Sequence, residues 1–146
     1  MSERVWALTD DNSWRDFLRT RYPITLGRDV AEAGVETWGD SCPRGWRDVF
    51  VRLMDRLEAL AASEPIDVRS RYRIGDLKQK FGVLTVRLEG EATEGMRDAI
   101  HAAENQSGEI CEVCGAPGVL APRGATGWMS PRCVAHETWT RFDGLA

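Results

Sequence analysis

The chain has 146 residues, a length that suits one domain or one domain with a small appended module. Its composition, 42% hydrophobic and 29% charged, is typical of a soluble globular protein with its own core. A formal net charge of −4 argues against a protein that coats nucleic acid over most of its surface. The first ten residues resemble no signal peptide, and no apolar run suits a membrane span, so a cytoplasmic protein is expected.

A short amphipathic helix is expected first. Residues 10–13 offer several N-cap oxygens, and Trp14, Phe17 and Leu18 then follow at helical spacing. This helix should end near Arg21, before Pro23. The next stretch, residues 24–40, has weak periodicity and is interpreted as irregular.

The clearest helix covers about residues 43–62. Ser41 can cap it, and Pro43 suits its first turn. A wide apolar face predicts packing on a core, and Pro65 ends the pattern. The apolar face consists of Trp46, Val49, Phe50, Leu53, Met54, Leu57, Leu60 and Ala61. The opposite, polar face consists of Arg47, Asp48, Arg52, Asp55, Arg56 and Glu58.

From residue 68 the apolar period changes to two, which predicts two antiparallel strands joined by a loop over residues 77–82. The first strand alternates Val68, Tyr72 and Ile74 with Arg69, Arg71 and Arg73. The second alternates Leu84, Val86 and Leu88 with Val83, Thr85 and Arg87, and Glu89 and Gly90 close it. One face of this hairpin should pack on the long helix and the other should carry arginines.

A third helix should run from a Thr93 cap to about residue 106, with Gly108 at its end. Its inward positions are Met96, Ala99, Ile100 and Ala103. The predicted fold class is therefore α+β, with helices packed on a small antiparallel hairpin and a metal-binding segment at the C-terminal end.

That segment contains two pairs of metal-ligand residues. Cys111 and Cys114 form one pair, and Cys133 and His136 form the other, each with two residues between its members. Such spacing lets a tight turn direct both side chains at one tetrahedral ion, and Gly115 permits the backbone that this turn needs. With four protein ligands the ion should be structural zinc, one per chain.

A hairpin between the pairs and a short helix carrying the second pair would make a treble-clef arrangement. We therefore divide the chain into an α+β body, residues 1–108, and a zinc module, residues 109–146, packed as one unit. Cys42 is interpreted as a buried thiol, although it can replace His136 as the fourth ligand if the fold brings it close.

Several motifs occur together and in order along nearly the whole chain. They are Arg21-Tyr22-Pro23-Ile24, Cys42-Pro43-Arg44-Gly45-Trp46, Lys78-Gln79-Lys80-Phe81-Gly82, Ala103-Glu104-Asn105-Gln106-Ser107, Cys111-Glu112-Val113-Cys114-Gly115, Gly127-Trp128 and Cys133-Val134-Ala135-His136. In these the chain resembles a widespread group of small, uncharacterised bacterial and phage proteins. Gln79 stands where members often have Glu, and Thr85-Val86-Arg87 stands where they have an Arg-Phe-Tyr-like strand. The resemblance implies a zinc site and no agreed activity.

The sequence predicts no catalytic residue. His101 is interpreted as a surface or packing residue, and neither a nucleophile–histidine arrangement nor a phosphate-binding loop is present. Glu104 and Ser107 are interpreted as caps of the helix end and of the zinc turn. A nuclease-like metal finger would need a further histidine, and with His136 on the zinc only His101 remains.

Two binding functions stay open. The first is contact with another protein, as in an accessory, immunity or phage anti-defence factor, since an acidic surface suits a basic partner. The second is nucleic-acid binding through residues 69–87, where six basic side chains face one acid, Asp76. The residues expected to contact a partner are Arg69, Arg71, Arg73, Lys78, Lys80, Phe81 and Arg87, called here the basic stretch. Acids on the helices are expected to neutralise part of this row.

Overall fold

The structure is a computed structural model that describes residues 6–26 and 42–138. Within these residues it is an α+β fold with four α-helices and two antiparallel sheets of two strands each. The helices are α1 (Asp11–Arg21), α4 (Arg47–Ala62), α5 (Ile66–Arg69) and α6 (Glu94–Ser107). The strands are β1 (Arg73–Lys80), β2 (Val83–Glu89), β3 (Val119–Arg123) and β4 (Trp128–Arg132). None of these helices is long and apolar enough to cross a membrane.

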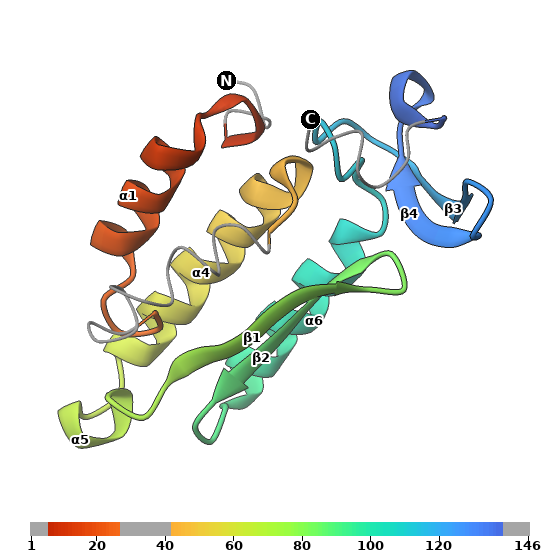
Figure 1. The fold of residues 1–146 in the computed structure, drawn as a ribbon. Coiled ribbons are helices and arrows are strands. Elements are labelled where there is room, and N and C mark those ends of the chain that lie inside the picture. The colour runs from red at the N-terminus through yellow and green to blue at the C-terminus, as the bar shows by residue number, and fades with distance from the viewer. Residues whose placement is uncertain (1–5, 27–41, 139–146) are drawn as a thin grey trace.

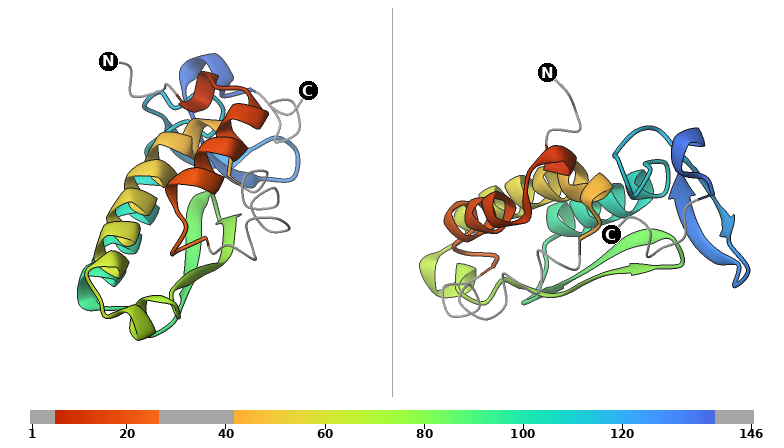
Figure 2. Two further views of the ribbon diagram at one scale, coloured as in Figure 1. Left: turned by 90° about the vertical axis from the view of Figure 1, so that its left-hand side faces the viewer. Right: turned by 45° about the horizontal axis from the view of Figure 1, so that its top comes forward.

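The three longer helices lie side by side with α4 in the middle, and the β1–β2 hairpin runs along them (Figures 1 and 2). The β3–β4 hairpin lies beyond the tip of the first hairpin, at one end of the molecule (Figure 1). The sequence predicted that the hairpin packs on the long helix, α4. In the structure β2 lies closest to α6, which in turn contacts α4. Helix and strand residues nevertheless share one buried apolar cluster.

The helix predictions are confirmed with small shifts. Asp10 caps α1 by accepting a hydrogen bond from the Ser13 amide, and Thr93 caps α6 by accepting one from the Met96 amide. A 3-10 turn, Arg44–Trp46, precedes α4. The predicted cap Ser41 and most of the irregular stretch 24–40 lie outside the described residues.

One residue of the predicted polar face of α4 is buried. The Arg47 side chain lies 5.0 Å from the Trp14 ring and donates to the Thr9 carbonyl oxygen and to Asp11 Oδ1, the latter at 2.7 Å. The N-terminal segment covers this position, so the prediction that Arg47 lies on the solvent-exposed face was wrong. The helical period could not show it, because the covering residues are distant in sequence.

The predicted first strand was partly wrong. Val68 and Arg69 belong to α5, and β1 begins only at Arg73, which pairs with Glu89 at the end of β2. Residues before Arg73 therefore have no partner strand. A register shift at Gly75 lets the strand continue through the expected loop, so that Leu77 points inward and the turn shrinks to Phe81 and Gly82.

Candidate metal centre

Four side chains from two separate turns converge at the end of the molecule. The donor atoms of Cys111, Cys114, Cys133 and His136 all lie within 4.8 Å of one another, so this cluster can bind a metal ion. Cys114 Sγ is 3.7 Å from Cys133 Sγ, and His136 Nδ1 is 3.7 Å from Cys111 Sγ and 3.2 Å from Cys133 Sγ. A tetrahedral ion with metal–sulfur bonds of about 2.3 Å separates its sulfur ligands by about 3.8 Å, close to the distance observed.

The first turn is shaped by its backbone. The Gly115 amide donates to the Cys111 carbonyl oxygen at 2.9 Å, and the φ of Gly115, +82°, is one that residues with a side chain rarely adopt. The Cys111 amide in turn donates to the Ala116 carbonyl oxygen at 2.7 Å. These bonds hold residues 111–115, called here the knuckle, in a tight turn that directs both thiols to the same point.

The second pair follows strand β4. A 3-10 turn, Val134–His136, stands where the first turn of a helix was expected, and residues beyond 138 lie outside the described chain. Although burial opposes it, hydrogen bonds from Cys114, Cys111 and the amides of His136 and Ala135 lower the pKa of Cys133. Burial raises the pKa of Cys114. Donors aimed at Cys133 favour its thiolate, the form that binds metal.

Cys42 does not belong to the cluster. Its side chain is buried at the start of the α4 segment, where its thiol lies 3.6 Å from the Pro43 carbonyl oxygen. Burial raises its pKa to about 12, which keeps it a neutral thiol. The interpretation of Cys42 as a buried thiol is confirmed, and its use as fourth ligand is not supported by the geometry.

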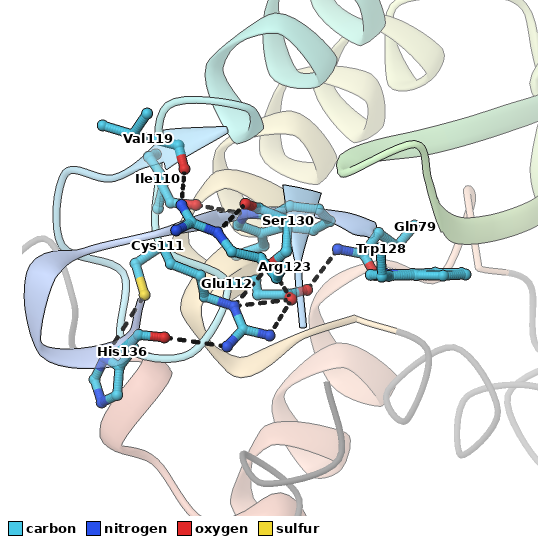
Figure 3. A network of polar contacts seen from close by, with 11 residues as sticks. Gln79, Ile110, Cys111, Glu112, Val119, Arg123, Trp128, Ser130 and His136 are labelled. Atoms are coloured by element: carbon cyan, nitrogen blue, oxygen red, sulfur yellow. Dashed lines mark hydrogen bonds and ion pairs between the residues drawn. The ribbon is translucent and has the colours of Figure 1, made fainter. Parts of the chain in front are cut away.

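A buried polar network lies beside Cys111 and His136 (Figure 3). Glu112, from inside the knuckle, accepts from Arg132 Nη2 at 2.9 Å and from the Ser130 hydroxyl. The Arg132 side chain is 1% exposed and also donates to the His136 carbonyl oxygen at 3.3 Å. This ion pair therefore links the two ligand pairs through protein atoms. We call Glu112, Ser130 and Arg132 the hub.

Sequence reasoning missed the hub. Glu112 and Arg132 are 20 residues apart, and no spacing rule pairs them. The sequence held one signal of the hub. Ser130 and Arg132 are two residues apart on a strand, so their side chains share a face. Their partner becomes evident only when the Glu112 amide is seen to bond to the Pro131 carbonyl oxygen, at 3.1 Å.

The hub also connects the cluster to the helical body. Gln79, near the end of β1, donates to Glu112 Oε2 at 2.6 Å and accepts from Trp128 Nε1 at 3.4 Å (Figure 3). At the start of α4, the Gly45 amide donates to the Glu112 carbonyl oxygen at 2.9 Å. A methyl group on Gly45 would lie 2.0 Å from the Cys111 carbonyl oxygen, so only glycine fits against the knuckle.

A groove of about 510 Å³ lies between the start of α4, the end of α6 and the knuckle. Its polar lining includes Asp48, Arg52, Gln106 and Glu109, and none of the four donor side chains lines it. The groove therefore gives no access to the metal position.

Other predicted site residues lie away from the cluster. His101 is exposed on α6, as expected. Ser107 and Glu104 do not cap the knuckle, because the Ser107 hydroxyl accepts from the Leu84 amide at 2.8 Å and Glu104 accepts from the Val86 amide at 3.2 Å. They hold α6 against β2, so their assignment to the knuckle was wrong.

The basic stretch is divided between elements. Arg69 donates to the Glu64 carbonyl oxygen beside α5, and Arg71 is exposed between α5 and β1. The other members are exposed on the hairpin and its turn: Arg73, Lys78, Lys80, Phe81 and Arg87. Three of these cations pair with acids. The acids belong to the strands, whereas the sequence predicted acids from the helices. The pairs are Arg73–Glu89 at 4.0 Å, Arg87–Glu89 at 3.6 Å and Lys78–Asp76 at 3.3 Å.

No protein-family model, curated protein or solved structure matches this chain.

Proposed function

We propose that the cluster binds one zinc ion per chain and that this zinc is structural. Three thiolates and one imidazole at tetrahedral spacing are a donor set that zinc prefers, and four protein ligands leave no coordination position for a substrate. The knuckle, the β3–β4 hairpin and the turn that carries His136 would together form a treble-clef-like module around the ion.

Elemental analysis of protein purified without added metal tests this proposal. One equivalent of zinc is expected, and Cys114→Ser should lose it because three donors hold zinc far more weakly than four. Cys42→Ser is the matched control, since its thiol lies outside the cluster, and it should keep the full equivalent. Less than half an equivalent in the unaltered protein, or iron in place of zinc, would contradict the proposal.

We further propose that the protein acts by binding another protein, as an accessory, immunity or phage anti-defence type factor, and not as an enzyme. The observation that carries this is the closure of the metal site. All four donors come from the chain, and the neighbouring carboxylate, Glu112, is already bound by Arg132, Ser130 and Gln79. Such a site organises a surface and performs no chemistry on a substrate.

The nucleic-acid alternative is the weaker one. Phosphate binding needs several cations that are free to exchange their counterions for the backbone. On the hairpin, Arg73, Lys78 and Arg87 are within 4.0 Å of strand acids, which reduces the positive potential of this face.

Capture of partners from the native host tests the binding role. The zinc-loaded chain should retain one host protein in near-stoichiometric amount, and treatment of the lysate with nuclease should not release it. The Cys114→Ser protein is the control that shows whether partner binding depends on the metal. Recovery of nucleic acid alone, or loss of the captured protein after nuclease treatment, would contradict a protein partner.

A further inference from the structure

The tip of the β1–β2 hairpin carries an aromatic residue in an unfavourable position. Phe81 has a φ of +53° and is 76% exposed, and it is the one non-glycine residue with positive φ in residues 6–26 and 42–138. A two-residue turn with positive φ at both positions normally has Asn, Asp or Gly first. A bulky side chain in this conformation is strained, and here it is also hydrated, so neither folding nor packing explains its presence.

The tip is held firmly although its side chain is exposed. A methyl group on Gly82 would lie 2.4 Å from Leu120 Cδ1 and 3.1 Å from the Met129 backbone, so the turn presses directly on the β3–β4 hairpin. Gln79, two residues before Phe81, is bound to both Glu112 and Trp128. Phe81 therefore projects from a fixed base and would lose little conformational freedom on binding.

One exposed apolar side chain of the metal-binding module lies against the tip. Leu120 contacts the turn and is 36% exposed. Val119 and Trp128 are also exposed, but the strand register places them on the opposite face of the β3–β4 hairpin. An exposed aromatic beside a further apolar side chain has the composition of a binding hot spot, in which one residue inserts into a pocket and its neighbour excludes water.

The charge at the tip is also distinctive. Lys80 is exposed, its Nζ lies 5.8 Å from the centre of the Phe81 ring, and no acid of the described chain lies within 4.0 Å of it. The other cations of the hairpin have acid partners, as described above. The tip therefore presents an aromatic ring together with one uncompensated positive charge.

We propose that Phe81 and Lys80, with Leu120 beside the turn, form the docking surface for a protein partner with an apolar pocket rimmed by carboxylates. This inference rests on the proposed binding function and deepens it. Phe81 fills the pocket, and Lys80 pairs with an acid at its rim. Nucleic acid is disfavoured as the occupant, since a single uncompensated cation offers one phosphate contact where stable binding needs several.

Selection of peptides from a phage-displayed random 16-residue library, against the zinc-loaded full chain, tests the surface directly and does not require the partner to be identified. Enriched peptides should combine acidic with aliphatic or aromatic residues. Fluorescence anisotropy with a synthetic copy should show that Phe81→Ala and Lys80→Glu each weaken binding at least tenfold. Ile66→Ala is the matched control, an apolar residue 77% exposed on α5 at the other end of the hairpin, and it should leave the affinity unchanged.

Phe81→Asn separates binding from folding. Asn suits a positive φ, so this variant should fold at least as stably as the unaltered chain and yet lose the peptide. Peptides that bind both Phe81 variants as well as the original would overturn this docking surface and leave the proposed function intact. Failure to enrich any peptide, together with failure to capture a host protein, would overturn both. Binding of labelled dT20 or U20 that Phe81→Ala abolishes would replace the protein partner with nucleic acid.

Discussion

The helical body and the metal-binding module are stabilised by different means. In the body, residues 6–26 and 42–108, one buried apolar cluster takes side chains from all three longer helices and from the β1–β2 hairpin. In the described part of the module, residues 109–138, the buried residues are Cys111, Glu112, Ser130, Pro131 and Arg132. A segment that buries one thiol, one proline and a polar network has little hydrophobic driving force of its own. We therefore expect the body to fold by burial and the module to depend on a bound metal ion.

The largest effect that this comparison predicts follows from loss of the metal. Zinc binding contributes on the order of 10 kcal/mol to folding in small finger peptides, more than the module's own contacts can replace. Cys114→Ser, or chelation, should therefore make residues 109–138 sensitive to limited proteolysis while α4 and α6 stay resistant. Mass spectrometry of the fragments locates the cuts. First cuts within α4 would show that the body also depends on the metal.

In the body, the corresponding test is a substitution that creates a cavity in the apolar core. Phe50 on α4 is fully buried and packs against Trp14, with ring centres 6.2 Å apart. Phe50→Ala should lower the free energy of unfolding by roughly 3–5 kcal/mol. Urea denaturation measures this, with Ile66→Ala as the exposed control, expected to change stability by less than about 0.5 kcal/mol. Zinc content should not change, so a variant that lost both stability and zinc would break the division between the two regions.

In the module, the hub allows the equivalent test on buried polar residues. Arg132→Met leaves the Glu112 carboxylate buried without its cation, and breaking a buried pair in this way costs roughly 3–5 kcal/mol. Adding Glu112→Met to the same chain removes the stranded charge and should recover part of the loss, although Gln79 and Ser130 then lack their acceptor. Chelator competition measures zinc affinity for both variants. A double variant that binds zinc more weakly than Arg132→Met would contradict this account of the hub.

The smallest effect concerns a helix cap in the body. Thr93→Ala removes the acceptor of the Met96 amide at the start of α6 and should cost about 1 kcal/mol. Thr93→Ser keeps the hydroxyl and should restore most of that stability. Thermal unfolding of the two variants checks the difference, and equal melting temperatures would show that the Thr93 hydroxyl does not stabilise α6.

The predictable parts of this fold are those governed by local rules. The helical period located α1, α4 and α6, and the caps marked the starts of α1 and α6, because packing of one face and satisfaction of end groups depend on nearby residues. Alternation located β2, but the first strand was placed too early. Its true start is set by where β2 ends, and the register shift at Gly75 reverses the parity that the alternation depends on. Neither feature can be predicted from the residues of the first strand alone.

The same distinction holds for the candidate site. Ligand spacing of two residues was enough to identify all four donors, since a knuckle is a local structure. The hub was not predictable, because Glu112 meets Arg132 only after the hairpin has folded back over the knuckle. Compensation of Arg73 and Arg87 by Glu89 likewise depends on strand register. Contacts that depend on tertiary structure leave no periodic signal in the sequence.

The most direct test of the central claim is amide hydrogen exchange on the full chain, measured with zinc bound and after chelation. Chelation should remove protection from the amides of Gly115 and His136, whose hydrogen bonds close the two metal turns, and of Gly118, which donates to the Glu109 carbonyl oxygen beside the knuckle. Amides in the middle of α4 and α6 should remain protected. Equal loss of protection in both regions, or no loss at Gly115 and His136, would contradict the claim that the metal stabilises the module and hydrophobic burial stabilises the body.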